Sequence, residues 1–116
     1  MTATGNLARA YESDGYITHL DIFSKSEIDK FRARFNEVEE REGREQCQIG
    51  LQGRHFDLRF LWEMATDPRV VDVVSECMGE NIMLLSTHVF CKYPENDAKK
   101  FVAWHQDITY WGLEPP

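Results

Sequence analysis

The sequence predicts an α+β fold in which helices occupy the first part of the chain and strands begin late. In the first part, apolar residues such as Phe31, Phe35 and Val38 recur at the spacing of one helix face. After Gly79 this spacing is lost, and residues 81–93 are rich in β-branched, aromatic and aliphatic side chains, which is typical of a strand. The 116 residues contain no internal repeat, low-complexity tract or linker, so they suffice for one small domain and no more.

Four helices are expected before Gly79, and two of them carry clear start signals. The expected helices cover residues 7–14, 24–41, 57–65 and 67–78. Ser24 and Glu27 fit a capping box, in which each side chain bonds to the backbone N–H of the other residue. Asp67 and Pro68 suit the N-cap and the first helical position of the last helix. The apolar stripes of these helices are interpreted as core positions.

Strands are expected where the composition changes. The expected strands cover residues 16–20, 81–93 and 101–111, and polar loops are expected over residues 43–53 and 94–100. Two long strands that follow each other in sequence form a poor independent sheet, and the chain reaches Pro116 just as a sheet begins. We therefore expect the N-terminal portion of a single larger domain, with a helical part at about 1–79 and the start of a β core at about 80–116.

The charge of the chain excludes several classes of partner. The sequence has 20 acidic and 13 basic residues and a formal net charge of -7. An acidic surface repels phosphate groups, so we expect neither nucleic-acid binding nor docking on an anionic membrane. The basic cluster Lys99-Lys100 is too small to reverse this expectation.

A cytoplasmic location is expected. Cys47, Cys77 and Cys91 form no CxxC pair, which favours reduced thiols in an intracellular protein. The N-terminal residues lack the apolar core of a signal peptide. The densest apolar run, Ile82 to Leu85, is too short to span a bilayer.

The strongest chemical signal is the pair His105 and Asp107. Side chains at positions i and i+2 of a strand point to the same face, so an imidazole and a carboxylate are expected side by side. These are two of the three ligands of the 2-His-1-carboxylate triad, which binds non-haem Fe(II) and leaves coordination positions open. By itself the H-x-D pattern is weak, since an isolated occurrence is more often a surface pair than a metal site.

The residues around this pair resemble the phytanoyl-CoA dioxygenase family. Trp104–Trp111, WHQDITYW, resembles the family signature WHQDxxYW, and Gly79–Leu85, GENIMLL, is similar to its G-x-N-I strand. That strand closes with a K-x-P element matched by Lys92–Pro94, and Tyr11–Tyr16 is similar to the family's N-terminal opening. The motifs are separated and fall in the family order, so the resemblance covers nearly the whole chain.

The resemblance implies a double-stranded β-helix, or jelly-roll, core that is preceded by helices and incomplete in this chain. It also implies Fe(II) as cofactor, 2-oxoglutarate as cosubstrate and O2 as oxidant, with hydroxylation of a small organic substrate. His105 and Asp107 would be the first two iron ligands and therefore catalytic. By position, His88 and Arg54 fall where the family contacts 2-oxoglutarate, the Arg54 match requiring a gap in the alignment.

Two features bear on the activity that the resemblance implies. In the family, the second triad histidine and the arginine that grips 2-oxoglutarate lie further on than Pro116, so we expect this chain by itself to be inactive. Related halogenating enzymes replace the carboxylate ligand with a small residue. Asp107 retains the carboxylate here, which favours hydroxylation over halogenation.

Alternative interpretations stay open at this point. From spacing alone, His88 is more often a hydrogen-bonded core histidine than a ligand. Trp104, Tyr110 and Trp111 can either pack within the fold or stack on a substrate. The chain as a whole can instead be a non-catalytic module that associates with another chain, or with itself, through an open sheet edge.

Overall fold

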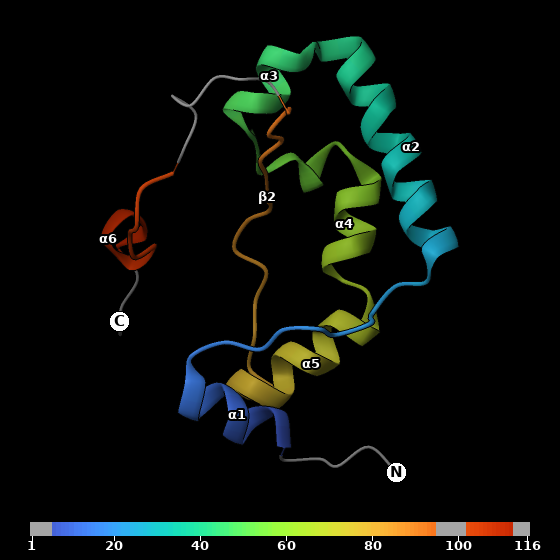
Figure 1. The fold of residues 1–116 in the computed structure, drawn as a ribbon. Coiled ribbons are helices and arrows are strands. Elements are labelled where there is room, and N and C mark those ends of the chain that lie inside the picture. The colour runs from blue at the N-terminus through green and yellow to red at the C-terminus, as the bar shows by residue number, and fades with distance from the viewer. Residues whose placement is uncertain (1–5, 95–101, 113–116) are drawn as a thin grey trace.

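The computed structural model of the chain describes residues 6–94 and 102–112, and the fold of this part is α+β, as predicted (Figure 1). In chain order the elements are α1 (Asn6–Asp14), α2 (Lys25–Glu42), α3 (Arg44–Ile49), β1 (Leu51–Gln52), the 3-10 helix η1 (Arg54–Phe56), α4 (Arg59–Ala65), α5 (Pro68–Met78), β2 (His88–Val89) and α6 (Ile108–Trp111). The two strands are antiparallel, with Leu51 opposite Val89 and Gln52 opposite His88.

The hydrophobic core lies where α2, α3, β1 and α4 meet. We call the buried residues there the core cluster, which consists of Phe35, Val38, Cys47, Leu51, Leu58 and Leu61. Phe60, Val89 and Cys91 are partly buried against it. Helix α1 packs instead against α5, at the end of the molecule away from α3, and extended residues 79–94 run between the two ends (Figure 1).

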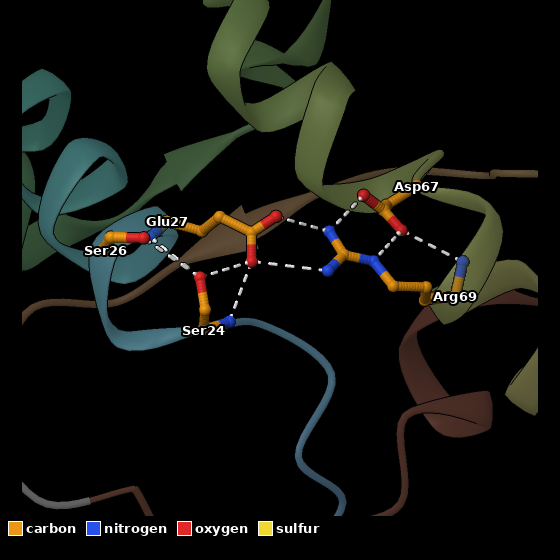
Figure 2. A network of polar contacts seen from close by, with 5 residues as sticks. All are labelled: Ser24, Ser26, Glu27, Asp67 and Arg69. Carbon is orange, nitrogen blue, oxygen red and sulfur yellow. Dashed lines mark hydrogen bonds and ion pairs between the residues drawn. The ribbon is translucent and has the colours of Figure 1, made fainter.

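The predicted starts of α2 and α5 are confirmed. The Glu27 N–H donates to the Ser24 side chain, and the Ser24 N–H donates to the Glu27 carboxylate at 2.8 Å, which completes the capping box of α2. Asp67 caps α5 by accepting from the Arg69 N–H at 2.9 Å, and Pro68 follows as the first helical residue. The Arg69 side chain also binds both Asp67 and Glu27, so the two helix starts are joined (Figure 2).

The predicted polar loop over residues 43–53 is wrong for much of its length. It contains helix α3 and strand β1, because Cys47 and Leu51 place their side chains in the core cluster. Gly43 and Gly50 flank α3 with positive φ angles of 87° and 117°, which glycine adopts without a steric penalty. These two glycines make the turns that allow so short a helix to lie against the core.

The extent of the first two predicted strands is also wrong. Residues 16–20 form no strand, and of residues 81–93 only His88–Val89 pair, because β1 offers two residues to pair with. A strand forms only where a neighbouring segment supplies hydrogen-bond partners. That condition is non-local and cannot be read from the composition of the segment itself.

The strand predicted over residues 101–111 is replaced by other structure. Residues 102–107 are irregular, and residues 108–111 form the single-turn helix α6, with the Tyr110 N–H donating to the Asp107 carbonyl at 2.9 Å. Phe101 and residues 95–100, which include Lys99-Lys100 and most of the predicted loop, lie outside the described residues. Among the helices that the structure describes, none combines the length and apolar character needed to cross a membrane.

Candidate functional site

The structure brings His105 and Asp107 together just before α6. The His105 Nε2 atom lies 3.2 Å from the Asp107 Oδ1 atom. The two side chains leave irregular backbone rather than a strand, so the basis on which their proximity was predicted is wrong although the two groups do meet. The Asp107 carbonyl accepts the first hydrogen bonds of α6, from Tyr110 at 2.9 Å and Trp111 at 3.2 Å, which fixes where Asp107 stands relative to that helix.

The His105 ring has a defined orientation. Its Nδ1 atom lies 2.8 Å from the Ala103 carbonyl oxygen. A carbonyl oxygen can only accept, so Nδ1 must carry the proton of this hydrogen bond, and in the neutral ring the lone pair then belongs to Nε2. Nε2 is the nitrogen that faces Asp107. A backbone carbonyl that holds the far ring nitrogen in this way is the usual support of a metal-binding histidine.

The contact between His105 Nε2 and Asp107 Oδ1 is repulsive when the imidazole is neutral and Nε2 carries its lone pair. A nitrogen lone pair and a carboxylate oxygen repel each other at 3.2 Å, so a cation between them, either a proton on Nε2 or a metal ion, makes the contact favourable. The separation is also close to the roughly 3 Å between adjacent ligand atoms that each lie about 2.1 Å from an octahedral ion.

The donor set fits Fe(II) in kind and covers only part of its coordination. Imidazole nitrogen and carboxylate oxygen are the ligand types of the non-haem iron triad. Both side chains are accessible, His105 at 39% and Asp107 at 80% relative exposure. Within residues 6–94 and 102–112, no group of three or more His, Cys, Asp or Glu side chains is arranged to hold a metal. A metal ion held here would take two ligands from the pair, and its other coordination positions would need other donors.

Aromatic side chains of α6 connect the His105 pair with β2. Tyr110 meets the His105 ring edge to face, with centroids 5.9 Å apart. The next residue, Trp111, lies 5.1 Å from the His88 ring, which also contacts Phe90 at 5.9 Å. His88 and His105 therefore each contact the single-turn helix α6, through two adjacent aromatic residues. Of the two roles left open for Trp111, packing within the fold is the one seen here, while it keeps 40% of its surface exposed.

His88 and its neighbour Thr87 face opposite ways, as expected for adjacent residues of an extended segment. The His88 ring lies with Phe90 and Trp111, half-buried. Thr87 points to the buried His55, whose Nδ1 lies 3.0 Å from the Thr87 Oγ1. His55 is the buried histidine that sequence reasoning missed, because its burial depends on a partner 32 residues away.

Arg54 is held by two carboxylates of the chain itself. Its Nη1 and Nη2 atoms donate to Glu42 at 2.7 and 2.8 Å, and Nε and Nη2 donate to Asp57 at 2.7 to 2.9 Å. Hydrogen bonds from Arg54 and then Arg41 lower the pKa of Glu42 to about 2, and Arg54 likewise lowers the pKa of Asp57. The predicted contact of Arg54 with 2-oxoglutarate stays a prediction, and it would require an incoming carboxylate to replace one already bound.

Comparison with known proteins identifies the family. The family model described as Phytanoyl-CoA dioxygenase (PhyH) matches residues 11–116, which includes the His105 and Asp107 pair. The comparison with curated proteins and the comparison with solved structures each returned no match. The family match spans most of the chain and agrees with the separated motifs of the sequence. The chain therefore belongs to the phytanoyl-CoA dioxygenase family.

Proposed function

We propose that the chain is the N-terminal portion of one domain of an Fe(II)- and 2-oxoglutarate-dependent dioxygenase that hydroxylates a small organic substrate. Membership of the phytanoyl-CoA dioxygenase family supports the reaction class. The observation that carries the proposal is the His105 Nε2 atom turned toward Asp107 Oδ1 at 3.2 Å, with Nδ1 held by the Ala103 carbonyl. The proposal includes a jelly-roll core, to which β1 and β2 would contribute.

In this proposal His105 and Asp107 hold the iron. Bound Fe(II), with 2-oxoglutarate and O2, would supply the oxidising chemistry of hydroxylation. The Ala103 carbonyl keeps the His105 proton on Nδ1, so Nε2 is available as a ligand without a tautomer change. Tyr110 contacts the His105 ring edge to face, with centroids 5.9 Å apart. The second histidine ligand is proposed to come from outside the described residues.

The carboxylate of Asp107 favours hydroxylation over halogenation. A carboxylate in this position occupies a coordination site that a halide would otherwise need. In the structure Asp107 Oδ1 faces His105 rather than turning away, which suits a shared ligand role. Within the same proposal, His88 beside Trp111 and Arg54 beside Asp57 are the candidate contacts of 2-oxoglutarate.

Anaerobic calorimetric titration of Fe(II) into the 116-residue chain tests the proposal. The wild type should show one saturable binding event, weak because the pair supplies two protein ligands. His105→Ala and Asp107→Ala should each abolish it. The matched controls His19→Asn and Asp72→Asn should retain it, since both residues are exposed and Asn tolerates the positive φ of 60° at position 19. Binding that survives both site variants would contradict the proposal.

A second candidate function, association of this chain with another copy, is supported by the open β2 edge. Met83 and Phe90 are 86% and 57% exposed on the segment that carries β2, and β2 pairs with β1 along two residues. Unpaired strand edges with apolar side chains favour edge-to-edge association. Sedimentation velocity separates the two functions, because association should weaken in Phe90→Glu whereas Fe(II) binding should not. A monomer at all concentrations would contradict the association.

A further inference from the structure

Two cysteines from distant parts of the chain meet at the edge of the core cluster. The Cys91 N–H donates to the Cys47 carbonyl oxygen at 3.3 Å. Cys47 belongs to α3, and the last carbonyl groups of a helix have no partner within the helix. The segment that follows β2 therefore supplies a hydrogen bond to the end of α3, and in doing so places the backbones of Cys47 and Cys91 next to each other.

The Cys47 and Cys91 backbones are close enough for a disulfide. Covalent bond lengths and the 3.3 Å hydrogen bond limit the separation of the two Cα atoms to about 7 Å. Any bend at the nitrogen or the oxygen shortens that separation. Disulfides join Cα atoms about 4.4 to 6.8 Å apart. The upper limit on the Cα separation therefore lies close to the range that a disulfide spans.

The two side chains share one environment. Side chains alternate along an extended segment, so Val89 and Cys91 point to the same side, and both pack against the core cluster that contains Cys47. His88 and Phe90 lie on the other side and contact each other. Cys47 is fully buried and Cys91 is half-buried, so Cys91 is the more solvent-exposed residue of the pair.

We propose that Cys47 and Cys91 are a reversible dithiol–disulfide pair that fastens the β2 segment to α3 under oxidising conditions. The half-buried Cys91 reacts first, because it is the more solvent-exposed residue of the pair. Burial raises the pKa of the Cys47 thiol, which suits Cys47 to the second, resolving step rather than the first.

With hydrogen peroxide as the oxidant, the reaction is balanced. The Cys91 thiol loses its proton, the thiolate attacks one peroxide oxygen, and the O–O bond breaks with formation of a sulfenic acid, while the departing hydroxide takes up the released proton as water. The Cys47 sulfur then attacks the Cys91 sulfur, the S–O bond breaks, and the departing hydroxide takes up the Cys47 proton as water. Two thiols and one peroxide give one disulfide and two waters. A small dithiol reductant reverses the change.

The disulfide would act on the segment that carries a candidate site residue. β2 is paired with β1 over two residues, and His88 is one of them. A covalent bond at Cys91, just beyond this pairing, would restrict opening of β2 and the position of His88 against Trp111. The third cysteine, Cys77, lies in α5, which packs against α1 and α4 at the end of the molecule away from α3, so it is an internal control (Figure 1).

Non-reducing peptide mapping by mass spectrometry tests the proposal on the wild-type 116-residue chain treated with hydrogen peroxide. The expected product is a cross-linked pair of peptides that contain Cys47 and Cys91, with two of the three thiols lost and both restored by dithiothreitol. The variant Cys77→Ser should give the same product. Sulfinic acid on Cys91 without a cross-link, or disulfides that involve Cys77 or a second chain, would overturn the proposal. Mapping of the wild type needs no substituted core residue to fold.

Amide hydrogen exchange tests the fastening itself. Oxidation should slow exchange at the amides of residues 88–91 several-fold in the wild type and in Cys77→Ser, because local opening of β2 becomes restricted. Cys91→Ser, which changes the partly exposed member of the pair, should show no slowing on oxidation. A cross-link that forms and leaves exchange at β2 unchanged would overturn the claim that the bond fastens this segment.

Discussion

Arg69 and Glu27, 42 residues apart, join the starts of two helices through one guanidinium group (Figure 2). Arg69 Nη2 donates to Glu27 Oε1 at 2.7 Å, while Arg69 Nε donates to Asp67 Oδ1 at 2.8 Å. The same Glu27 carboxylate accepts from the Ser24 N–H. The arginine thus ties the capping box of α2 to the N-cap of α5, and its guanidinium also lies over the Phe23 ring at 5.0 Å.

Removing this arginine should lower the urea midpoint of unfolding. Arg69→Ala breaks contacts between two helices, whereas the control Arg59→Ala breaks an exposed pair with Glu63 within α4 alone. Exposed pairs within one helix contribute little, so the Arg59 variant should lie close to the wild type. Arg69→Lys keeps the charge but loses the planar guanidinium that bonds both Asp67 and Glu27. Its urea midpoint should lie between those of the wild type and Arg69→Ala. Equal midpoints for Arg69→Ala and Arg59→Ala would contradict the bridging role.

Stability should fall on acidification in a defined window. Hydrogen bonds from Arg69 and then Ser24 lower the pKa of Glu27 from 4.5 to about 2. A depressed carboxyl pKa stabilises the folded state above the unfolded-state value, and this contribution is lost as pH falls through the folded-state value. The melting temperature should therefore decline between about pH 4.5 and pH 2, and Glu27→Gln should flatten part of that decline. The control Glu12→Gln, at an exposed position of α1, should show the same decline of melting temperature with pH as the wild type. A wild-type decline in Glu27→Gln would contradict the stabilising role of the Glu27 carboxylate.

Alanine substitutions at Gly50 and Gly79 can distinguish the cost of backbone strain from the cost of a side-chain clash. Gly50 and Gly79 have positive φ angles of 117° and 90°, but a Cβ atom would meet Phe90 at 3.0 Å only at Gly50. Gly79→Ala should cost about 1 to 3 kcal/mol in the free energy of unfolding from backbone strain alone, because φ 90° and ψ 170° lie in a region that favours glycine. Gly50→Ala should cost more, since the Phe90 ring must shift. The excess should vanish in the Phe90→Ala background in urea unfolding; an excess that persists there would point to strain and not to the clash.

The proposed 2-oxoglutarate contact of Arg54 makes a prediction through Asp57. Asp57 is the more exposed of the two carboxylates on Arg54, at 54% against 20% for Glu42, so it is the one that an incoming carboxylate would displace. Asp57→Asn should strengthen 2-oxoglutarate binding in saturation-transfer NMR, and Arg54→Lys should weaken it. Asp72→Asn should behave as the wild type. Unchanged binding in both the Asp57 and Arg54 variants would contradict the contact.

The parts of the fold that sequence predicts well are local ones. Ser24 with Glu27 and Asp67 with Pro68 are recognisable because capping is decided within four residues of the chain. The strands were overestimated because pairing needs a second segment, and the Leu51 and Val89 register depends on residues 38 positions apart. Helix α3 was missed because its polar composition resembles a loop, while the burial of Cys47 is a tertiary effect.

The candidate site also has a part that the local sequence predicts and a part that depends on tertiary structure. The proximity of His105 and Asp107 is predictable, since two residues of spacing allow contact in several backbone conformations. The support of the His105 ring by Ala103 is not predictable, because it depends on the irregular path of residues 102–107. The engagement of Arg54 by Glu42, 12 residues away, likewise has no signature in the local sequence.

The measurement that tests the central claim most directly is the proton–nitrogen correlation spectrum of the four histidine imidazoles, recorded anaerobically before and after addition of Fe(II). Before addition, neutral His105 should show the tautomer protonated on Nδ1, as its bond to the Ala103 carbonyl requires. After addition, the His105 signals should broaden first, ahead of those of His19 and the buried His55. An Nε2-protonated His105, or signals that stay sharp while other histidines broaden, would contradict the assignment of His105 and Asp107 as the iron pair.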